Sequence, residues 1–191
     1  MYYIDKNYTN TLEVKQSKFI THLIPYEHYQ STLEALKLQH PKARHFVVSY
    51  RYLNEFDQIV EHSSDDGEPK GTSGKPTLFV LQGAELINCA VIVVRYFGGT
   101  KLGTGGLVRA YSDAVNLVVN IATLLEYKEM TKKRISFEYS DLRMVEYECE
   151  IHQVKILKKV FDSGALFEIE APLLEMQKFL ETLQRVLRVV S

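Results

Sequence analysis

The chain has 191 residues, with 23 basic and 24 acidic side chains and a formal net charge of −1 at pH 7. This near balance excludes a strong overall attraction to nucleic acid or to an anionic membrane, so any such site must be a local patch. The 46% hydrophobic content is unlike that of a disordered chain, and the length lies between one large domain and two small ones.

The first half of the chain alternates strands and helices. Alternation of apolar and polar residues predicts one or two strands over 10–24, with a break at 16–18. Helical spacing of apolar residues predicts a helix over 26–39 that Pro41 closes. β-Branched and aromatic residues then predict a strand over 45–53.

Two loops contain most of the glycines. Residues 61–76 read EHSSDDGEPKGTSGKP, which predicts a loop, and a short helix over 76–83 and a buried strand over 89–97 follow it. The second loop lies in RYFGGTKLGTGGLVRAY, residues 95–111, which holds five glycines, three cations and no acid. From Leu107 to Ile121, apolar residues at helical spacing predict an amphipathic helix, with Tyr111 on its buried face.

The pattern changes at 126–131, which we interpret as a domain boundary. We expect an N-terminal domain over 1–127 and a C-terminal domain over 131–191. The second domain is predicted to contain a strand, a helix, two strands and a helix, over 134–140, 141–152, 154–161, 165–172 and 173–187, with at most a short final strand. This order is that of a ferredoxin-like domain without a full last strand, so the fold class is α+β with two domains.

The cysteines and the apolar segments limit the setting of the protein. Cys89 and Cys149 show no CxxC spacing and no nearby histidine that would complete a metal set, so we expect buried free thiols. The N-terminus is polar and charged where a signal peptide has an apolar run, and no stretch approaches the roughly 20 apolar residues of a membrane span. A reducing, cytoplasmic setting without a membrane partner follows as the expectation.

The glycine loop has the local chemistry of an anion site. Backbone N–H groups and the positive end of a helix dipole point outward where a strand turns into a helix. The named phosphate motifs do not fit, because the pair Gly74 and Lys75 is followed by Pro76, and the third glycine of the dinucleotide pattern is Val108. We therefore expect no nucleotide cofactor of either type. The glycines could equally serve only positive φ and close packing.

The acidic loop offers Glu61, His62, Asp65, Asp66 and Glu68, which could bind a metal or transfer protons if they converge. Their spacing is not that of an EF-hand, and a dicarboxylate site for Mg²⁺ stays an unspecific alternative, so no metal is expected. The ordinary interpretation is a solvated turn, or a turn that docks onto the cations of the glycine loop. Docking would make the two loops one site.

Three further features have ordinary interpretations beside functional ones. His45 opens a strand, where a lone histidine is more often structural than a base. Thr72 and Ser73 lie among glycines but lack the G-x-S-x-G pattern of a nucleophile. Basic runs at 132–134 and 155–159 could contact nucleic acid, although charges on a solvated sheet face explain them as well.

A longer pattern resembles a known family. DDGEPKGTSGKPTL at 65–78 and VIVVRYFGGTKLGTGGLVRAYSDA at 91–114 together resemble the signature of the IMPACT family in its bacterial form. The segments QSKFI at 16–20 and HPKARHFVVSYRY at 40–52 are similar to the family's leading segments. The resemblance covers about 17–120.

The resemblance implies a fold and a class of function. It implies an N-terminal α/β sandwich like the second domain of ribosomal protein S5, and a C-terminal ferredoxin-like domain resembling the last domain of elongation factor G. Eukaryotic relatives act as translational regulators, bacterial relatives have been proposed to bind nucleic acid or ribosomes, and no enzymatic activity is firmly attached to the family. Arg44 departs from the pattern, since relatives tend to carry a small hydroxyl residue there, and Ser73 replaces the usual alanine.

The motif positions that we expect to form a binding site follow from the same resemblance. They are His45, Asp66, Glu68, Thr72, Arg95, Gly98, Gly99, Lys101, Gly103, Gly105, Gly106 and Arg109.

Three functions remain open at this point, and one of them is a purely structural or chaperone-like interaction. The favoured one is a binding protein of translation control that contacts RNA, the ribosome or a translation-factor-related protein through the acidic and glycine loops. The alternative is an enzyme on a phosphorylated or nucleotide substrate, with acid/base or Mg²⁺-binding groups in His45 and the acidic loop and with phosphate held by the glycine-loop cations. The enzyme requires His45 to lie within about 10 Å of Glu68 and Lys101, because acid/base groups must reach the substrate.

Overall fold

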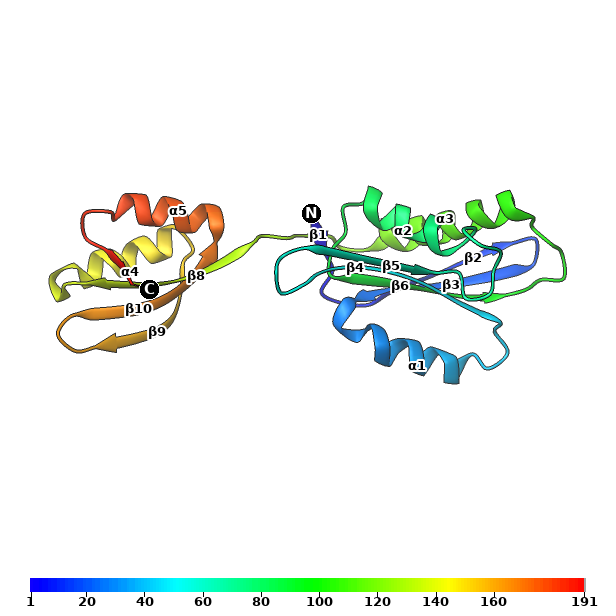
Figure 1. The fold of residues 1–191 in the computed structure, drawn as a ribbon, viewed down its shortest axis with the longest axis horizontal. Coiled ribbons are helices and arrows are strands. Elements are labelled where there is room, and N and C mark those ends of the chain that lie inside the picture. The colour runs from blue at the N-terminus through cyan, green and yellow to red at the C-terminus, as the bar shows by residue number, and fades with distance from the viewer. Residues whose placement is uncertain (191) are drawn as a thin grey trace. The chain divides into compact units, whose positions relative to one another are not determined.

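The computed structural model describes residues 1–190. The chain divides into two compact units, Met1–Tyr127, here called unit 1, and Lys128–Ser191, here called unit 2. Each unit has its own main sheet and its own hydrophobic core, and the ribbon of each is seen in Figure 1.

Unit 1 is built on a five-stranded antiparallel sheet with the order β2-β3-β6-β4-β5. The strands are β2 (Tyr8–Val14), β3 (Ser17–Pro25), β4 (His45–Leu53), β5 (Ile59–Ser64) and β6 (Cys89–Tyr96). The central strand β6 is buried from Cys89 to Arg95. Its continuous apolar sequence reflects helices on both faces of the sheet, which leave no face for polar side chains.

Helices cover the two faces of this sheet unequally. The short η1 (Tyr26–His28) and α1 (Tyr29–Gln39) lie on one face, and α2 (Gly74–Gly83) and α3 (Thr104–Ile121) lie on the other (Figure 1). The larger core lies under α2 and α3, where Leu81 and Leu107 pack against the sheet. Under α1, Leu36 packs in a smaller core.

The predicted loop over 61–76 is wrong at its start. Residues 61–64 belong to β5, which pairs with β4 so that Tyr50 lies opposite His62. β5 lies at the edge of the sheet, where much of its surface is exposed to water, so most of its residues are polar. Its composition therefore resembles that of a loop. The helix that follows begins at Gly74 rather than at 76, and the two-residue strands β1 (Tyr2–Tyr3) and β7 (Leu125–Glu126) were not predicted.

Unit 2 has a four-stranded antiparallel sheet with the order β11-β8-β10-β9. Its elements are β8 (Met130–Phe137), η2 (Tyr139–Asp141), α4 (Leu142–Ile151), β9 (Lys155–Phe161), β10 (Ala165–Pro172), α5 (Leu173–Thr182) and β11 (Arg188–Val190). The predicted strand over 134–140 starts earlier, at Met130, and the last helix is shorter than predicted. Both helices share one core with the sheet and therefore cover one of its faces.

The cysteines are free and buried in separate units. Burial raises the pKa of the Cys89 thiol to about 12 and that of the Cys149 thiol to about 11. Both are therefore protonated at neutral pH, in agreement with the prediction of buried free thiols. Among residues 1–190, no helix is long and apolar enough to cross a membrane.

Candidate functional site

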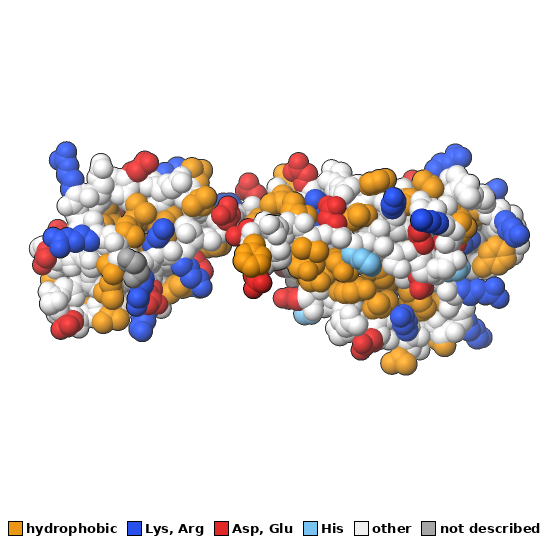
Figure 2. Space-filling model, viewed as in Figure 1, with side chains coloured by type: hydrophobic (Ala, Val, Ile, Leu, Met, Phe, Trp, Pro, Cys, Tyr) orange, Lys and Arg blue, Asp and Glu red, His pale blue; other side chains and the backbone are white. Residues whose placement is uncertain are grey.

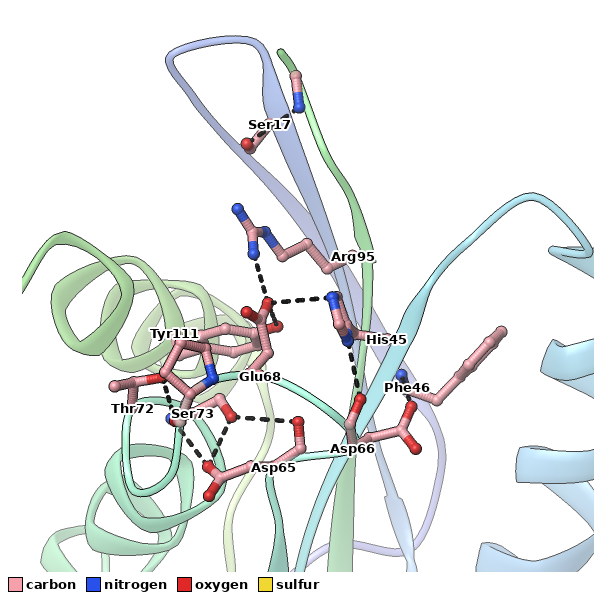
Figure 3. Close-up of polar contacts among 12 residues, drawn as sticks. Ser17, His45, Phe46, Asp65, Asp66, Glu68, Thr72, Ser73, Arg95 and Tyr111 are labelled. Atoms are coloured by element: carbon pink, nitrogen blue, oxygen red, sulfur yellow. Dashed lines mark hydrogen bonds and ion pairs between the residues drawn. The ribbon is translucent and has the colours of Figure 1, made fainter. Parts of the chain in front are cut away.

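Since residues 61–64 belong to β5, the acidic loop in the structure is residues 65–73, and hydrogen bonds to the Asp65 carboxylate hold it closed. Oδ2 accepts the Gly71 N–H at 2.7 Å, and Oδ1 accepts the N–H groups of Ser73 at 3.1 Å and Gly74 at 2.8 Å. The Ser73 hydroxyl donates to the same Oδ1 at 2.7 Å (Figure 3). These donors lie at the start of α2, so the carboxylate also satisfies N–H groups that a helix N-terminus leaves without a partner.

Asp66 attaches the loop to the beginning of β4. Its Oδ2 accepts the Phe46 N–H at 2.6 Å, and its carbonyl oxygen accepts from His45 Nδ1 at 2.8 Å. Since a carbonyl only accepts, the proton is on Nδ1. The other ring nitrogen, Nε2, faces the Glu68 carboxylate at 3.9 Å (Figure 3).

Glu68 is the contact between the acidic loop and the rest of unit 1. Its side chain is only 4% exposed, and its Oε1 forms a short ion pair with Arg95 Nη1 and accepts the Tyr111 hydroxyl at 2.8 Å. Arg95 comes from β6 and Tyr111 from α3, so the carboxylate joins three segments that are distant in sequence. Burial and the neighbouring Glu68 carboxylate raise the pKa of Tyr111, and its hydroxyl stays a donor.

The Arg95 guanidinium is enclosed by aromatic rings. Its carbon lies 5.4 Å from the centroid of Phe19 and 5.9 Å from that of Phe97. Its Nε is buried and has no hydrogen-bond partner within the described chain. The cation is thus positioned by the ion pair and by the rings together.

The other two cations of the glycine loop have a different environment. Lys101 and Arg109 are exposed, and no ion pair within residues 1–190 includes either of them. The acidic loop therefore docks onto Arg95 alone. The remaining two positive charges face the solvent.

The glycine loop passes very close to the β2–β3 turn. A Cβ on Gly98 would lie 2.0 Å from the carbonyl carbon of Gln16 and 2.2 Å from the nitrogen of Ser17. The Gly98 N–H donates to the Ser17 hydroxyl at 3.2 Å. Only glycine fits this approach of two backbones.

The other four predicted glycines differ in backbone conformation and in what an added Cβ would meet. Gly99 and Gly103 have φ of +85° and +73°, which favours glycine. α3 begins at Thr104, so Gly105 and Gly106 lie in its first turn, where an added Cβ would meet nothing at Gly105 and the Leu102 Cβ at 3.1 Å at Gly106. No acidic residue lies in this first turn, so the positive end of the helix dipole is not compensated there.

Four of the predicted site residues, His45, Asp66, Glu68 and Arg95, contact one another in one network. Lys101 and Arg109 stay outside it, and Thr72 is turned inward and donates to the Pro69 carbonyl at 2.7 Å. The sequence indicated Asp65 only as one of several possible metal-binding or acid/base groups, and it did not predict Tyr111 as a site residue. Tyr111 falls on the predicted buried face of its helix, but its hydroxyl partner is set by the tertiary fold. Within residues 1–190, no group of three or more His, Cys, Asp or Glu side chains is arranged to hold a metal ion.

Asp65→Asn is expected to lower the free energy of unfolding at neutral pH and to have a smaller effect in acid. Burial alone raises the pKa of Asp65, but the hydrogen bonds from Gly71, Ser73 and Gly74 outweigh it and the net pKa is lowered below 3.8. A depressed carboxyl pKa stabilises the fold above the unfolded pKa, and this stability is lost as the pH falls through the folded pKa. The substitution should therefore cost about 1–2 kcal/mol at pH 7 and progressively less below pH 3.8.

Urea unfolding across this pH range measures the effect. Asp113→Asn serves as the control, because Asp113 is exposed on α3 and its substitution should change little at either pH. A deficit for Asp65→Asn that does not change with pH would contradict the role given to the charge.

The segment that contains this network is similar to known proteins. Residues 15–119 match the family model described as the Impact N-terminal domain. The chain belongs to the IMPACT family. An IMPACT family member of Haemophilus influenzae is 40% identical over 158 residues, which are 80% of this chain and 75% of that protein. The IMPACT family member YigZ of Escherichia coli is 34% identical over 170 residues, 87% of this chain and 83% of that protein.

A solved structure is also similar. The crystal structure of a hypothetical protein is 30% identical, and it covers 100% of this chain and 96% of its own with a TM-score of 0.68. The acidic loop and the glycine loop both lie inside the segment that matches the IMPACT domain, whereas unit 2 lies beyond its end.

Proposed function

We propose that the chain is a binding protein of translation control that contacts RNA, the ribosome or a translation-factor-related protein through the surface formed by the acidic and glycine loops. The resemblance to a family whose eukaryotic members regulate translation supports the setting. The observation that carries the proposal is the unequal use of charge at the site. The acidic groups are bonded within the fold, whereas cations and a helix N-terminus remain exposed.

The charge argument proceeds residue by residue. Asp65 and Asp66 accept hydrogen bonds from their own loop and from β4, and Glu68 is paired with Arg95. Their negative charges are thus partly compensated and held in place. The exposed cations in the two loops and in the helices that follow them are Lys70, Lys75 of α2, Lys101, and Arg109 of α3. A phosphate group would meet these cations together with the uncompensated start of α3.

We further propose the domain assignment and the fold relationships. The proposed domains are 1–127, with the fold of the second domain of ribosomal protein S5, and 131–191, with a ferredoxin-like fold related to the last domain of elongation factor G. The support in unit 2 is its chain order of β-α-β-β-α-β and its sheet order β11-β8-β10-β9.

Unit 2 can add contact area through the face of its sheet that the helices leave open. Side chains that alternate with the buried Ile135 and Phe137 point to this face. By register it carries five cations and two acids, namely Lys132, Arg134, Lys155, Lys158 and Arg188 against Glu168 and Glu170. Both acids are in ion pairs with cations of β8. The surplus of positive charge suits a phosphate backbone.

The double change Lys101→Glu with Arg109→Glu is expected to weaken binding to ribosomes or RNA by at least about tenfold, and to reduce the slope of log affinity against log salt by about 1 for each lost phosphate contact. Ribosome co-sedimentation and RNA filter binding at several salt concentrations measure this. Lys37→Glu is the matched control, because Lys37 is exposed on α1, on the opposite face of the sheet. If binding is absent in the unchanged protein, or equal in both variants, the proposal is wrong.

One observation favours the alternative of an enzyme on a phosphorylated or nucleotide substrate. His45 Nε2 lies 3.9 Å from the buried Glu68 carboxylate, which is close enough for the two groups to exchange a proton through a small movement. Against it, Glu68 Oε1 is already engaged by Arg95 and Tyr111. Turnover of a phosphorylated substrate that His45→Ala abolishes, with RNA binding unchanged, would distinguish this function from the binding protein.

A further inference from the structure

A group of stacked tyrosines lies on the α1 face of the unit 1 sheet, away from the two loops. Tyr50 and Tyr52 lie two residues apart on β4, so both side chains point to this face, and Tyr26 of η1 packs over them. The ring centroids of Tyr26 and Tyr52 are 4.1 Å apart with an interplanar angle of 8°, and those of Tyr26 and Tyr50 are 5.1 Å apart. Tyr29 joins the group at 5.2 Å from Tyr50. We call these four residues the tyrosine surface.

The tyrosine surface is accessible although its rings pack together. All four tyrosines are partly exposed, and α1 covers only the neighbouring part of the sheet, around Leu36. Hydrophobic side chains, a class that includes tyrosine, gather on the visible face of unit 1 over β4 and β5 and beside the start of α1 (Figure 2). Rigid amphipathic tyrosines lose little conformational entropy on binding and are enriched in binding surfaces.

A pocket of about 470 Å³ adjoins this surface and has a single sign of charge. Tyr26 and Tyr52 form part of its wall, together with Tyr3. The charged side chains that line it are Asp5 and Glu27, both exposed, and no lysine or arginine is among its lining residues in the described chain. Glu27 Oε1 lies 3.4 Å from Nε2 of the exposed His28, which is outside the lining of the pocket. Aromatic rings beside carboxylates, with no lysine or arginine in the lining, form a favourable environment for an organic cation.

The pKa of Tyr26 agrees with this environment. Burial raises the pKa of Tyr26 to about 12, and the neighbouring Tyr52 and Tyr50 rings contribute in the same direction. The ring is therefore neutral at physiological pH, and its hydroxyl adds no negative charge. The negative potential at the pocket comes from the two carboxylates.

We propose that the tyrosine surface and its pocket bind an arginine or lysine side chain presented by a basic segment of a partner protein. The extent of the surface beyond the pocket favours a peptide segment over a single small amine, because the pocket alone would hold the small ion. The acids at the pocket disfavour RNA, whose phosphates they would repel. This inference goes beyond the proposed function, since the surface lies on the opposite face of the sheet from the pair formed by Glu68 and Arg95.

Peptide titration of the full chain tests the proposal. The sequence contains no tryptophan, so tyrosine emission can be followed directly. A peptide of alternating glycine and arginine should bind with saturation, and so should its lysine counterpart, whereas peptides with glutamine or glutamate in those places should not. Glu27→Lys and Tyr52→Ala should each lower the affinity by about tenfold.

Controls separate the surface from general effects. Tyr147→Ala removes a tyrosine that is 60% exposed on α4 in unit 2, and it should leave the affinity unchanged. Because Glu27 is exposed, Glu27→Lys keeps the test decisive even if Tyr52→Ala unfolds. The proposal is overturned if the glutamate peptide binds as tightly as the arginine peptide, or if Glu27→Lys leaves the affinity for the arginine peptide unchanged. It is also overturned if an RNA oligonucleotide binds more tightly than the arginine peptide and Tyr52→Ala weakens that RNA binding. The Lys101→Glu and Arg109→Glu variant should bind the arginine peptide normally, so the two proposals can fail separately.

Discussion

Replacing Glu68 by alanine is expected to lower the free energy of unfolding of unit 1 by about 3–5 kcal/mol. The change leaves the Arg95 guanidinium without its counter-charge in a place where the residue is only 5% exposed. Its Nε already has no partner in the described chain, so the network holds no second acceptor in reserve. The Tyr111 hydroxyl loses its acceptor as well, which adds the cost of an unsatisfied buried donor.

Amide hydrogen exchange of β6 in increasing urea reports this stability for unit 1 without assuming that both units unfold together. Glu175→Ala is the control, because Glu175 is partly exposed and pairs with the exposed Lys178 at 2.8 Å, and its loss should cost no more than about 0.5 kcal/mol. The double change Glu68→Leu with Arg95→Met should recover much of the loss, since it removes both charges. A loss below about 1 kcal/mol for Glu68→Ala would show that Arg95 gains water or another partner.

The elements that the sequence predicted are those whose signal is local. The uninterrupted apolar stretch of β6 and the helical spacing of α3 each arise from burial of their own residues, so both were found close to their bounds. β5 was missed because its stability comes from pairing with β4, while its own residues are polar. The short β1 and β7 pair with each other although nearly the whole sequence of unit 1 separates them, so no local pattern reveals the pairing.

The same distinction applies to the candidate site. An acidic loop close to glycine-loop cations suggested a docked pair, and the contact between Glu68 and Arg95 has that form. Which cation would be used could not be predicted, because it depends on Arg95 pointing to the same side of β6 as the buried Val93 and not on its charge. The tyrosine surface shows the limit from the other side. The strand predicted over 45–53 contains Tyr50 and Tyr52, but the approach of Tyr26 to them depends on where η1 follows β3.

Gly98→Ala and Gly105→Ala are expected to change stability in opposite directions, although both glycines lie in the same loop-to-helix segment. At Gly98 the new methyl group would lie 2.0 Å from a backbone carbon of Gln16, so the β2–β3 turn or the end of β6 must move. That turn is held by Lys15 and Gln16 with φ of +46° and +65°, and it has little freedom to adjust. We expect a loss of about 1–3 kcal/mol, as for other overpacked sites.

At Gly105 the added methyl group meets no atom within 4 Å and lies in the first turn of α3. Alanine there should stabilise the helix by about 0.5–1 kcal/mol, because glycine loses more backbone entropy on folding. Hydrogen exchange in β6 and α3 measures both variants under the same conditions. If Gly105→Ala stabilises unit 1 and also weakens RNA binding, a ligand approaches the backbone at Gly105, because a packing role alone would leave binding unchanged. A stabilising Gly98→Ala would contradict the close approach of this loop to the β2–β3 turn.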